Sequence, residues 1–172
     1  MCEDVLDNLE PFFEDKELSF DPEVNEQQLN ELHSIFKNDF ITNPFQFDSS
    51  TVLIKEVNSE HKGQPDFFKN YLHDFVHCIT RKNDLTNRRQ LEPMRANRIH
   101  WIKPILLNSS DKRIKYYKFT ENDGKVRDYF WYEEKEYVVI LEKKSNDYWL
   151  VTGHCVDDKM KHSRRYQKYR FK

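Results

Sequence analysis

The sequence predicts an α+β fold, with N-terminal helices packed on a four-stranded antiparallel meander sheet and a basic C-terminal helix. Apolar residues recur at helical spacing in the first half of the chain, whereas residues 114–156 hold four short runs rich in β-branched and aromatic residues. The connections ENDG, EEKE and SND between these runs are short enough to join only antiparallel neighbours. Helices that precede an antiparallel sheet are typical of the α+β class.

The first expected elements are a helix over residues 25–40 and a strand over residues 50–57. In the helix, Leu32 and Phe36 lie on one apolar face, and the Asn-Pro pair that follows ends the element. The strand segment, STVLIKEV, alternates in polarity and is rich in β-branched residues.

Two further helices are expected over residues 65–81 and 88–107. Pro65 suits the first position of a helix, although the end of this segment, VHCIT, could instead be extended because of its β-branched residues. The second helix is expected to begin after Pro93 and to stop before Pro104.

The four strands of the meander are expected over residues 114–120, 125–133, 137–144 and 148–156. The NDG sequence between the first two is a strong turn signal, because Asn, Asp and Gly tolerate positive φ. A final helix is expected over residues 157–170, with Asp157 or Asp158 as its cap.

The composition excludes several classes of protein. The chain has 172 residues, enough for one domain with a small appendage, and its 15% aromatic content can supply a core despite a mean hydropathy of -0.94. Only 3 glycines occur, and no dinucleotide-binding or P-loop motif is present. No apolar run is long enough for a membrane span, and the acidic N-terminus is unlike a signal peptide. Because Cys2, Cys78 and Cys155 are odd in number and widely spaced, we expect a reduced, cytoplasmic protein.

The net charge of -2 hides a strong asymmetry along the chain. Residues 1–50 contain two lysines and 13 acidic residues, whereas residues 51–172 contain 26 basic and 17 acidic residues, so the net charges are -11 and +9. This split favours a basic half that meets a polyanion, and two solvated surfaces of opposite sign are the alternative. We therefore expect an acidic helical segment at the start of the chain and a basic functional half after it; the bounds 1–49 and 50–172 for the segment and the domain are those that the resemblance described below implies.

Arg95 and Arg98 form a candidate phosphate clamp. Their spacing of three residues places two planar guanidiniums side by side on a helix. The alternative is that both arginines form surface ion pairs, with Glu92 or with the acidic half of the chain.

The C-terminal segment is a second candidate polyanion-binding surface. Residues 159–172 contain seven basic residues and no acidic one, with Tyr166, Tyr169 and Phe171 interleaved. Cations can neutralise phosphates and aromatic rings can stack on bases, so this pattern suits RNA. A solvated helix whose basic side chains lie along the surface is the alternative.

The last predicted strand ends in polar residues. Alternation places Thr152 and His154 on one face, together with Leu150, and Gly153 between them would let another backbone or a ligand approach closely. The cysteine after His154 points to the opposite face, which disfavours a thiolate–imidazolium pair.

The histidines indicate acid–base chemistry rather than metal binding. His73 and His77 are four residues apart, but no third spaced ligand, CxxC or HExxH motif accompanies them, so we expect neither a metal nor a cofactor. Metal-independent RNA cleavage requires a general base, a general acid, and cations or hydroxyl donors around the phosphate, because the nucleophile is the 2′-OH of the RNA itself. Histidine, arginine, threonine and tyrosine are the residue types that serve these roles.

Four segments together resemble phage- and prophage-encoded nuclease domains of the barnase–EndoU–colicin–RelE superfamily of RNases. They are FVHCITR (75–81), RANRIHWIKPIL (95–106), GKVRDYFWYEEKEYVVIL (124–141) and YWLVTGHCVD (148–157). The shared motifs resemble His-x-x-Thr-Arg, Arg-x-x-Arg-Ile-x-Trp-Ile and a strand with Tyr-x-Leu-Val-Thr, and Gly153 and His154 depart from the pattern after that threonine. The resemblance covers residues 50–172 and implies two helices against a four-stranded antiparallel sheet.

The resemblance implies a metal-independent endoribonuclease of toxin type. His77 would act as general acid or base, Arg81, Arg95 and Arg98 would bind the scissile phosphate, and Thr152 would donate a hydrogen bond to it. The residues expected to extend the RNA-binding surface are Thr80, Lys103, His154, Lys161, Arg164 and Arg165. RNA is the expected partner, an antitoxin or immunity protein is a candidate second partner, and no membrane is involved.

The alternative is a non-catalytic module that binds RNA or protein, such as an immunity or phage accessory protein. An acidic surface can mimic nucleic acid or bind a basic partner, which fits residues 1–49. The same segment could fold over the basic surface and restrain RNA binding. The nuclease hypothesis requires His77, Arg95, Arg98 and Thr152 to meet in one cleft.

Overall fold

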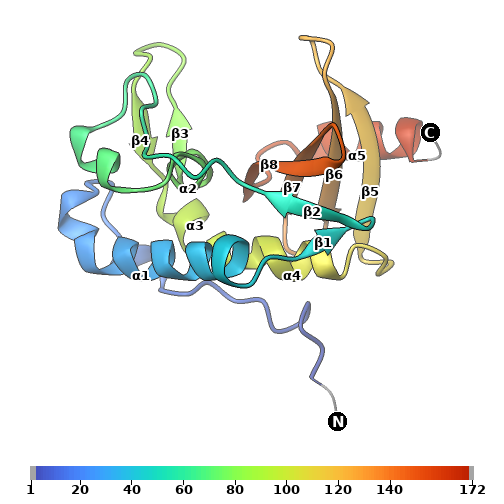
Figure 1. Ribbon diagram of the computed structural model, residues 1–172, viewed down its shortest axis with the longest axis horizontal. Helices are drawn as coiled ribbons and strands as arrows, with labels where there is room; N and C mark the ends of the chain where they lie inside the picture. Colours follow the sequence, from blue (N-terminus) through green and yellow to red (C-terminus); the bar gives the residue numbers. More distant parts are fainter. Residues whose placement is uncertain (1–2, 171–172) are drawn as a thin grey trace. The chain divides into compact units, whose positions relative to one another are not determined.

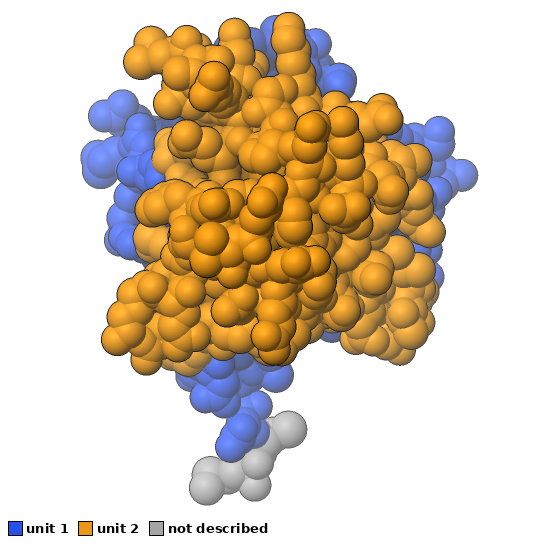
Figure 2. Space-filling model, turned by 90° about the vertical axis from the view of Figure 1, so that its left-hand side faces the viewer, with its two compact units in different colours: residues 1–9, 45–53, 101–172 blue, residues 10–44, 54–100 orange. Residues whose placement is uncertain are grey.

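The computed structural model describes residues 3–170 and divides the chain into two compact units, coloured separately in Figure 2. Unit 1 comprises residues 1–9, 45–53 and 101–172, and unit 2 comprises residues 10–44 and 54–100. Each unit therefore combines residues from before and after position 49. Two residues on which predictions rest, Cys2 among the cysteines and Phe171 in the C-terminal segment, lie outside the described residues.

Unit 1 contains a six-stranded mixed sheet (Figure 1). Its strands are β1 (Gln46–Phe47), β2 (Ser50–Leu53), β5 (Ile114–Thr120), β6 (Val126–Tyr132), β7 (Tyr137–Lys144) and β8 (Asp147–Cys155). They lie in the order β1-β2-β8-β7-β6-β5, and every neighbouring pair is antiparallel except β2 and β8. The turn between β5 and β6 uses Gly124 at a φ of 81°, as the NDG signal predicts.

The prediction of a four-stranded antiparallel meander is wrong. Strands β5 to β8 follow one another as expected, but β2 pairs in parallel with β8, and β1 pairs with β2. The sheet therefore has six strands and mixed pairing. Parallel neighbours need a long connection, so no short turn in the sequence could reveal that residues near 50 pair with residues near 150. A separate two-stranded sheet in unit 2 was also not predicted.

Two helices cover opposite faces of the sheet in unit 1. Helix α4 (Ile102–Leu107) packs against β1, β6 and β7, and helix α5 (Lys159–Tyr169) packs against β5. The Asp158 carboxylate caps α5 by accepting a hydrogen bond from the amide of Lys161 at 2.9 Å. This end of the chain thus forms the basic helix that the sequence predicts.

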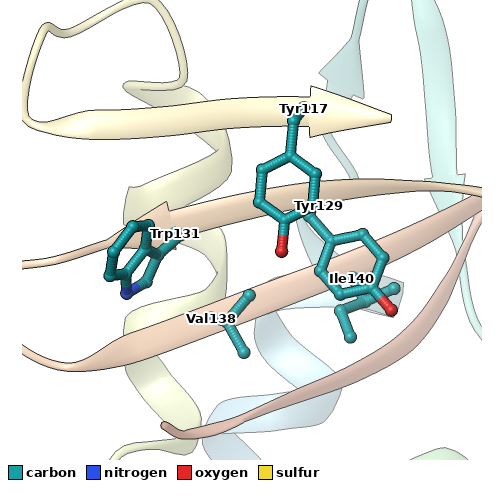
Figure 3. Packing of buried hydrophobic residues seen from close by; sticks show 5 residues of the cluster. All are labelled: Tyr117, Tyr129, Trp131, Val138 and Ile140. Carbon is teal, nitrogen blue, oxygen red and sulfur yellow. The ribbon is translucent and has the colours of Figure 1, made fainter. Parts of the chain in front are cut away.

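Aromatic residues from neighbouring strands form the core on the face covered by α5. Figure 3 shows the buried cluster of Tyr117, Tyr129, Trp131, Val138 and Ile140. The rings of Tyr117 and Tyr129 stack with centroids 4.9 Å apart. Tyr166 and Tyr169 of α5 pack against the same cluster, so these two rings help to hold the helix on the sheet and are only partly exposed.

A β-bulge changes the faces of β8. Ile140 pairs with Thr152, whereas Leu141 pairs with Leu150, so Val151 is an extra residue in the ladder. Thr152 therefore shares the face of Ile140, and Leu150 shares the opposite face with Leu141. The prediction that Leu150 and Thr152 lie on one face is wrong, because strict alternation does not survive a bulge.

Gly153 allows a side chain of α4 to approach β8 closely. A Cβ atom at this position would lie 2.6 Å from Cγ1 of Ile102 and 2.8 Å from the hydroxyl of Tyr137. The close approach expected from the sequence therefore comes from packing within unit 1.

Replacing Gly153 with alanine should destabilise the protein by about 1–3 kcal/mol, because the new methyl group overlaps a well-packed core. Chemical denaturation measures this cost. In an Ile102→Ala background the additional cost should be smaller, since the side chain in closest contact is gone. An equal cost in both backgrounds would contradict the packing argument.

His162 fixes α5 to the sheet. Its Nδ1 forms a hydrogen bond of 2.7 Å with the Tyr117 hydroxyl, and burial lowers the pKa of His162 from 6.5 to about 4. Because the pKa is lower in the folded state, the stabilisation is complete above pH 6.5 and is lost as the pH falls toward 4.

Acidification should therefore weaken the docking of α5. Between pH 7 and pH 4, the free energy of unfolding should fall by about 2–3 kcal/mol more in the wild type than in His162→Gln, which cannot titrate. Denaturation curves at several pH values measure this difference. Parallel pH dependences in the two proteins would contradict the assignment.

Unit 2 is mainly helical. Its helices and turns are η1 (Asp15–Glu17), η2 (Glu23–Asn25), α1 (Glu26–Lys37), η3 (Asn38–Thr42), η4 (Asp66–Asn70), α2 (His73–Ile79) and α3 (Pro93–Ala96), and η5 (Ile99–Trp101) follows them. Its hairpin consists of β3 (Thr80–Lys82) and β4 (Arg89–Leu91). Buried Phe36 of α1 meets Phe75 of α2, with ring centroids 5.6 Å apart.

Two predicted helices are shorter and more broken than expected. The segment 65–81 forms η4 and α2, and its β-branched end continues from Thr80 as β3. The segment 88–107 forms β4, α3, η5 and α4, and Pro104 lies in the first turn of α4, where a missing amide is tolerated. No helix within residues 3–170 has the length and apolar character required to cross a bilayer.

Candidate functional site

A cluster of three histidines in unit 2 is the candidate functional site. His73 and His77 are one turn apart on α2, so they share a face of the helix. His61, from the loop before η4, stacks on His73 with ring centroids 3.7 Å apart and lies 5.4 Å from the ring of His77. Three imidazoles from two segments are thus brought into one group.

The loop that carries His61 is held by its own hydrogen bonds. The side-chain oxygen of Gln64 accepts a hydrogen bond from the His61 amide at 3.1 Å, and its amide group donates to the Ser59 carbonyl at 2.9 Å. The Ser59 amide in turn donates to the carbonyl of Tyr71 just before α2. These bonds fix the loop next to the histidine face of α2.

Thr80 orients two arginines beside the histidines. Its buried hydroxyl donates to the Val76 carbonyl at 2.6 Å and accepts a hydrogen bond from Arg89 at 3.0 Å. Its carbonyl accepts a hydrogen bond from Arg95 at 3.1 Å. Arg95 also binds the carboxylate of Glu92 at 2.6 Å, so Arg89 keeps more of its donors available than Arg95 does.

Gly63 places strand β4 and therefore Arg89. The Arg89 amide donates to the Gly63 carbonyl at 2.9 Å, and Gly63 has a φ of 79°. A Cβ atom at Gly63 would lie 2.0 Å from the carbonyl oxygen of Asn87. Only glycine fits this contact between the His61 loop and the hairpin.

Burial and positive charge keep the histidines neutral. Burial, followed by the charge of Arg89, lowers the pKa of His77 from 6.5 to about 3. Burial also lowers the pKa of His61 to about 4, and it lowers the pKa of His73. At pH 7 the cluster therefore offers imidazole bases beside the charged guanidiniums of Arg89 and Arg95.

The hydrogen bonds of His61 define its tautomer. Its Nε2 lies 3.0 Å from the carbonyl oxygen of His73, which can only accept, so Nε2 carries the hydrogen and Nδ1 keeps a lone pair in the neutral ring. Two rings stacked at 3.7 Å repel each other when both are charged, so the His61–His73 pair favours at most one added proton.

The predicted site residues of unit 2 have different environments. His77 is one of the three clustered histidines, and Thr80 and Arg95 lie beside them; together with Arg89 they form the histidine–arginine cluster. Arg81 is exposed and lies 3.4 Å from a carboxylate oxygen of Glu92. The guanidinium of Arg98 binds the Asp15 carboxylate through two hydrogen bonds of 2.9 and 3.2 Å.

Acidic residues near the N-terminus bind arginines in both units. Within unit 2, Asp15 binds Arg98, which is a contact of the kind that the restraint hypothesis requires. Within unit 1, Asp4 and Asp7 bind Arg113 at 2.8 and 2.6 Å. These ion pairs attach part of the acidic segment to basic side chains. The alternative to a phosphate clamp, in which arginines form ion pairs with the acidic half, also expects such contacts.

The other predicted site residues belong to unit 1: Lys103, Thr152, His154, Lys161, Arg164 and Arg165. Thr152 is buried on β8, and His154 is partly buried two residues later. The Arg165 guanidinium stacks on the ring of Phe119 at 3.6 Å, whereas Lys161 and Arg164 are exposed on α5. The Nζ of Lys103 lies 5.3 Å from the ring centroid of Phe45.

His61 and Arg89 are members of the cluster that sequence reasoning did not select. His61 has no periodic relation to the α2 histidines, and its position depends on the Gln64 loop. Arg89 lies in the segment 88–107, for which the sequence predicts a helix and no strand. A strand prediction for residues 89–91 would have pointed to Arg89, because alternation along a strand places it on the same side as buried Leu91.

No group of three or more histidine, cysteine or acidic side chains within residues 3–170 has the arrangement of a metal site. The comparisons with known proteins give no further guide. No family model, curated protein or solved structure matches the chain. Its function must therefore be inferred from the chemistry of its own residues.

Proposed function

We propose that the protein is an endoribonuclease that needs no metal, and that the histidine–arginine cluster of unit 2 is its active site. The observation that carries this proposal is the grouping of three neutral imidazoles beside two guanidiniums. Imidazoles supply general acids and bases, and guanidiniums stabilise the negative charge that develops on a phosphate.

The chemistry follows from the substrate. The 2′-oxygen forms a bond to the adjacent phosphorus as the bond between phosphorus and the 5′-oxygen breaks. His77, neutral at pH 7, takes the proton of the 2′-OH. The His61–His73 pair, which takes up one proton when the phosphate binds, gives that proton to the departing 5′-oxygen. Arg89 donates to the non-bridging oxygens while Thr80 holds its guanidinium in place.

A bound phosphate would adjust the histidines for this role. Burial, followed by the charges of Arg89 and Arg95, lowers the pKa of His77, and burial, followed by the charge of Arg95, lowers the pKa of Arg89. An anion between them offsets these charges and raises the pKa values of the nearby imidazoles. The substrate thus brings the histidines closer to the values that suit proton transfer near pH 7.

The test is an incubation of purified protein with total RNA in the presence of EDTA. The proposal expects cleavage that persists in EDTA, because no metal takes part. RNA that stays intact with wild-type protein over a range of pH values would overturn the proposal.

A non-catalytic RNA-binding module is the second candidate, and one feature of unit 1 favours it. Lys161, Arg164 and Lys168 are exposed along α5 at helical spacing, and within residues 3–170 no ion pair neutralises them. Such a stripe can bind a phosphate backbone without cleaving it. Tight binding of RNA without cleavage would favour this candidate.

The proposal includes a cytoplasmic setting and RNA as the partner. An active ribonuclease endangers the cell that makes it, so a toxin-type enzyme also implies a neutralising antitoxin or immunity protein. The acidic segment supports neutralisation within the chain itself, because Asp15 already pairs with Arg98.

A further inference from the structure

We propose that the active site of unit 2 takes single-stranded RNA and that Phe20 stacks on an unpaired base next to the scissile phosphate. This inference rests on the proposed function and names its substrate class. Phe20 is 71% exposed, which is unusual for a phenylalanine, and it lines two adjoining grooves of unit 2.

The larger groove joins Phe20 to the catalytic arginine. It has a volume of about 550 Å³ and is lined by residues 20–23, 63–65 and 88–91. Arg89, which lowers the pKa of His77, belongs to its lining, and so does exposed Arg88. A ligand in this groove can therefore contact both the aromatic ring and Arg89, the arginine whose charge acts on His77.

The smaller groove continues along the hairpin. It has a volume of about 280 Å³. Phe20 lines it together with two exposed basic residues, Arg81 and Lys82, and two acidic residues, Asp84 and Glu92. Basic side chains thus occur in the lining of both grooves. An exposed ring beside basic side chains can bind unpaired nucleotides, because the bases stack and the phosphates are neutralised.

The charges also give the bound nucleotide a direction. Asp21 and Glu23 lie in the lining at the Phe20 end of the larger groove, and the arginines lie in the β4 part of it. Carboxylates repel a phosphate but accept hydrogen bonds from the amino groups of bases. The base is therefore placed against Phe20 and the phosphate against Arg89.

Duplex RNA does not satisfy this arrangement. Its base faces are covered by their neighbours, and its base edges are paired, so neither Phe20 nor the carboxylates could reach them. The groove thus selects loops, ends and single strands.

The test measures binding of a short RNA in which every 2′-OH is methylated. The methyl group blocks the nucleophile, so the probe binds without being cut. We expect the single strand to bind at least tenfold more tightly than the same strand annealed to its complement. Phe20→Ala should weaken single-strand binding about tenfold, and Phe20→Trp should restore it.

Phe12→Ala is the matched control, because Phe12 is also an exposed phenylalanine of unit 2 but lines a different groove, along α1. This variant should bind the probe as the wild type does. Equal binding by Phe20→Ala and the wild type, or equal binding of duplex and single strand, would overturn the inference.

The two proposals fail in different ways. If the wild type leaves unmodified RNA intact but binds the methylated strand through Phe20, the nuclease proposal fails and the base-stacking site stands. If RNA is cut in EDTA and Phe20→Ala neither weakens binding nor changes the preference for single strands, the site proposed for Phe20 is wrong and the nuclease proposal stands.

Discussion

Replacing His77 with alanine should lower the rate of RNA cleavage by about 10²–10⁴-fold, the usual contribution of a general base. Burial and Arg89 hold His77 in its neutral form at pH 7, ready to take the proton of the 2′-OH. Single-turnover cleavage of a defined RNA measures the loss. The affinity for a methylated RNA should change little, because the imidazole acts in the transition state.

His100→Ala is the control for this variant. His100 is also a partly buried histidine of unit 2, and its Nε2 lies 3.0 Å from the carbonyl oxygen of Glu10, outside the cluster. Cleavage by this variant should remain near the wild-type rate. Equal activity of His77→Ala and the wild type would remove His77 from the mechanism.

Replacing Arg89 with alanine should lower cleavage by about 10²–10³-fold, the usual loss when one donor to a developing oxyanion is removed. Arg89 is oriented by Thr80, and its charge is the main one that acts on His77. Removal of that charge should also raise the pKa of His77, so the pH dependence of cleavage should shift upward. A pH–rate profile measures both effects.

Arg98→Ala is the contrasting variant. The sequence favours Arg98 as a phosphate ligand, but its guanidinium is bound by the Asp15 carboxylate. Its loss should lower stability more than the rate of the chemical step. A larger fall in cleavage rate for Arg98→Ala than for Arg89→Ala would return the phosphate role to the predicted arginine pair.

Local signals predicted the strands of unit 1 well. Strands β5 and β7 have the predicted bounds, and β6 and β8 differ by one residue at each end, because short turns and alternation both act within a few residues. The pairing of β2 with β8 joins residues about one hundred positions apart, and no local pattern encodes it. The bulge at Val151 was hidden for a related reason, since it depends on the partner strand.

The candidate site shows the same division. His77, Thr80 and Arg95 were predicted, and all three lie in the cluster, because α2 and its junction with β3 bring them together. His61 depends on hydrogen bonds of its loop, and Arg89 depends on a hairpin that the helix prediction concealed. Residues placed by tertiary contacts were therefore missed, and of the arginine pair predicted from helical spacing only Arg95 lies in the cluster, because Arg98 binds Asp15.

The most direct test of the central claim uses a DNA oligonucleotide that contains a single ribonucleotide. Attack by a 2′-OH can occur only at that position, so cleavage should take place immediately after the ribonucleotide, in EDTA, and leave a 2′,3′-cyclic phosphate. The all-DNA control should remain intact, and His77→Ala should cut the oligonucleotide with the ribonucleotide about 10²–10⁴-fold more slowly than the wild type. Cleavage at deoxynucleotides, a product with a 3′-hydroxyl, or no cleavage at the ribonucleotide would contradict the account.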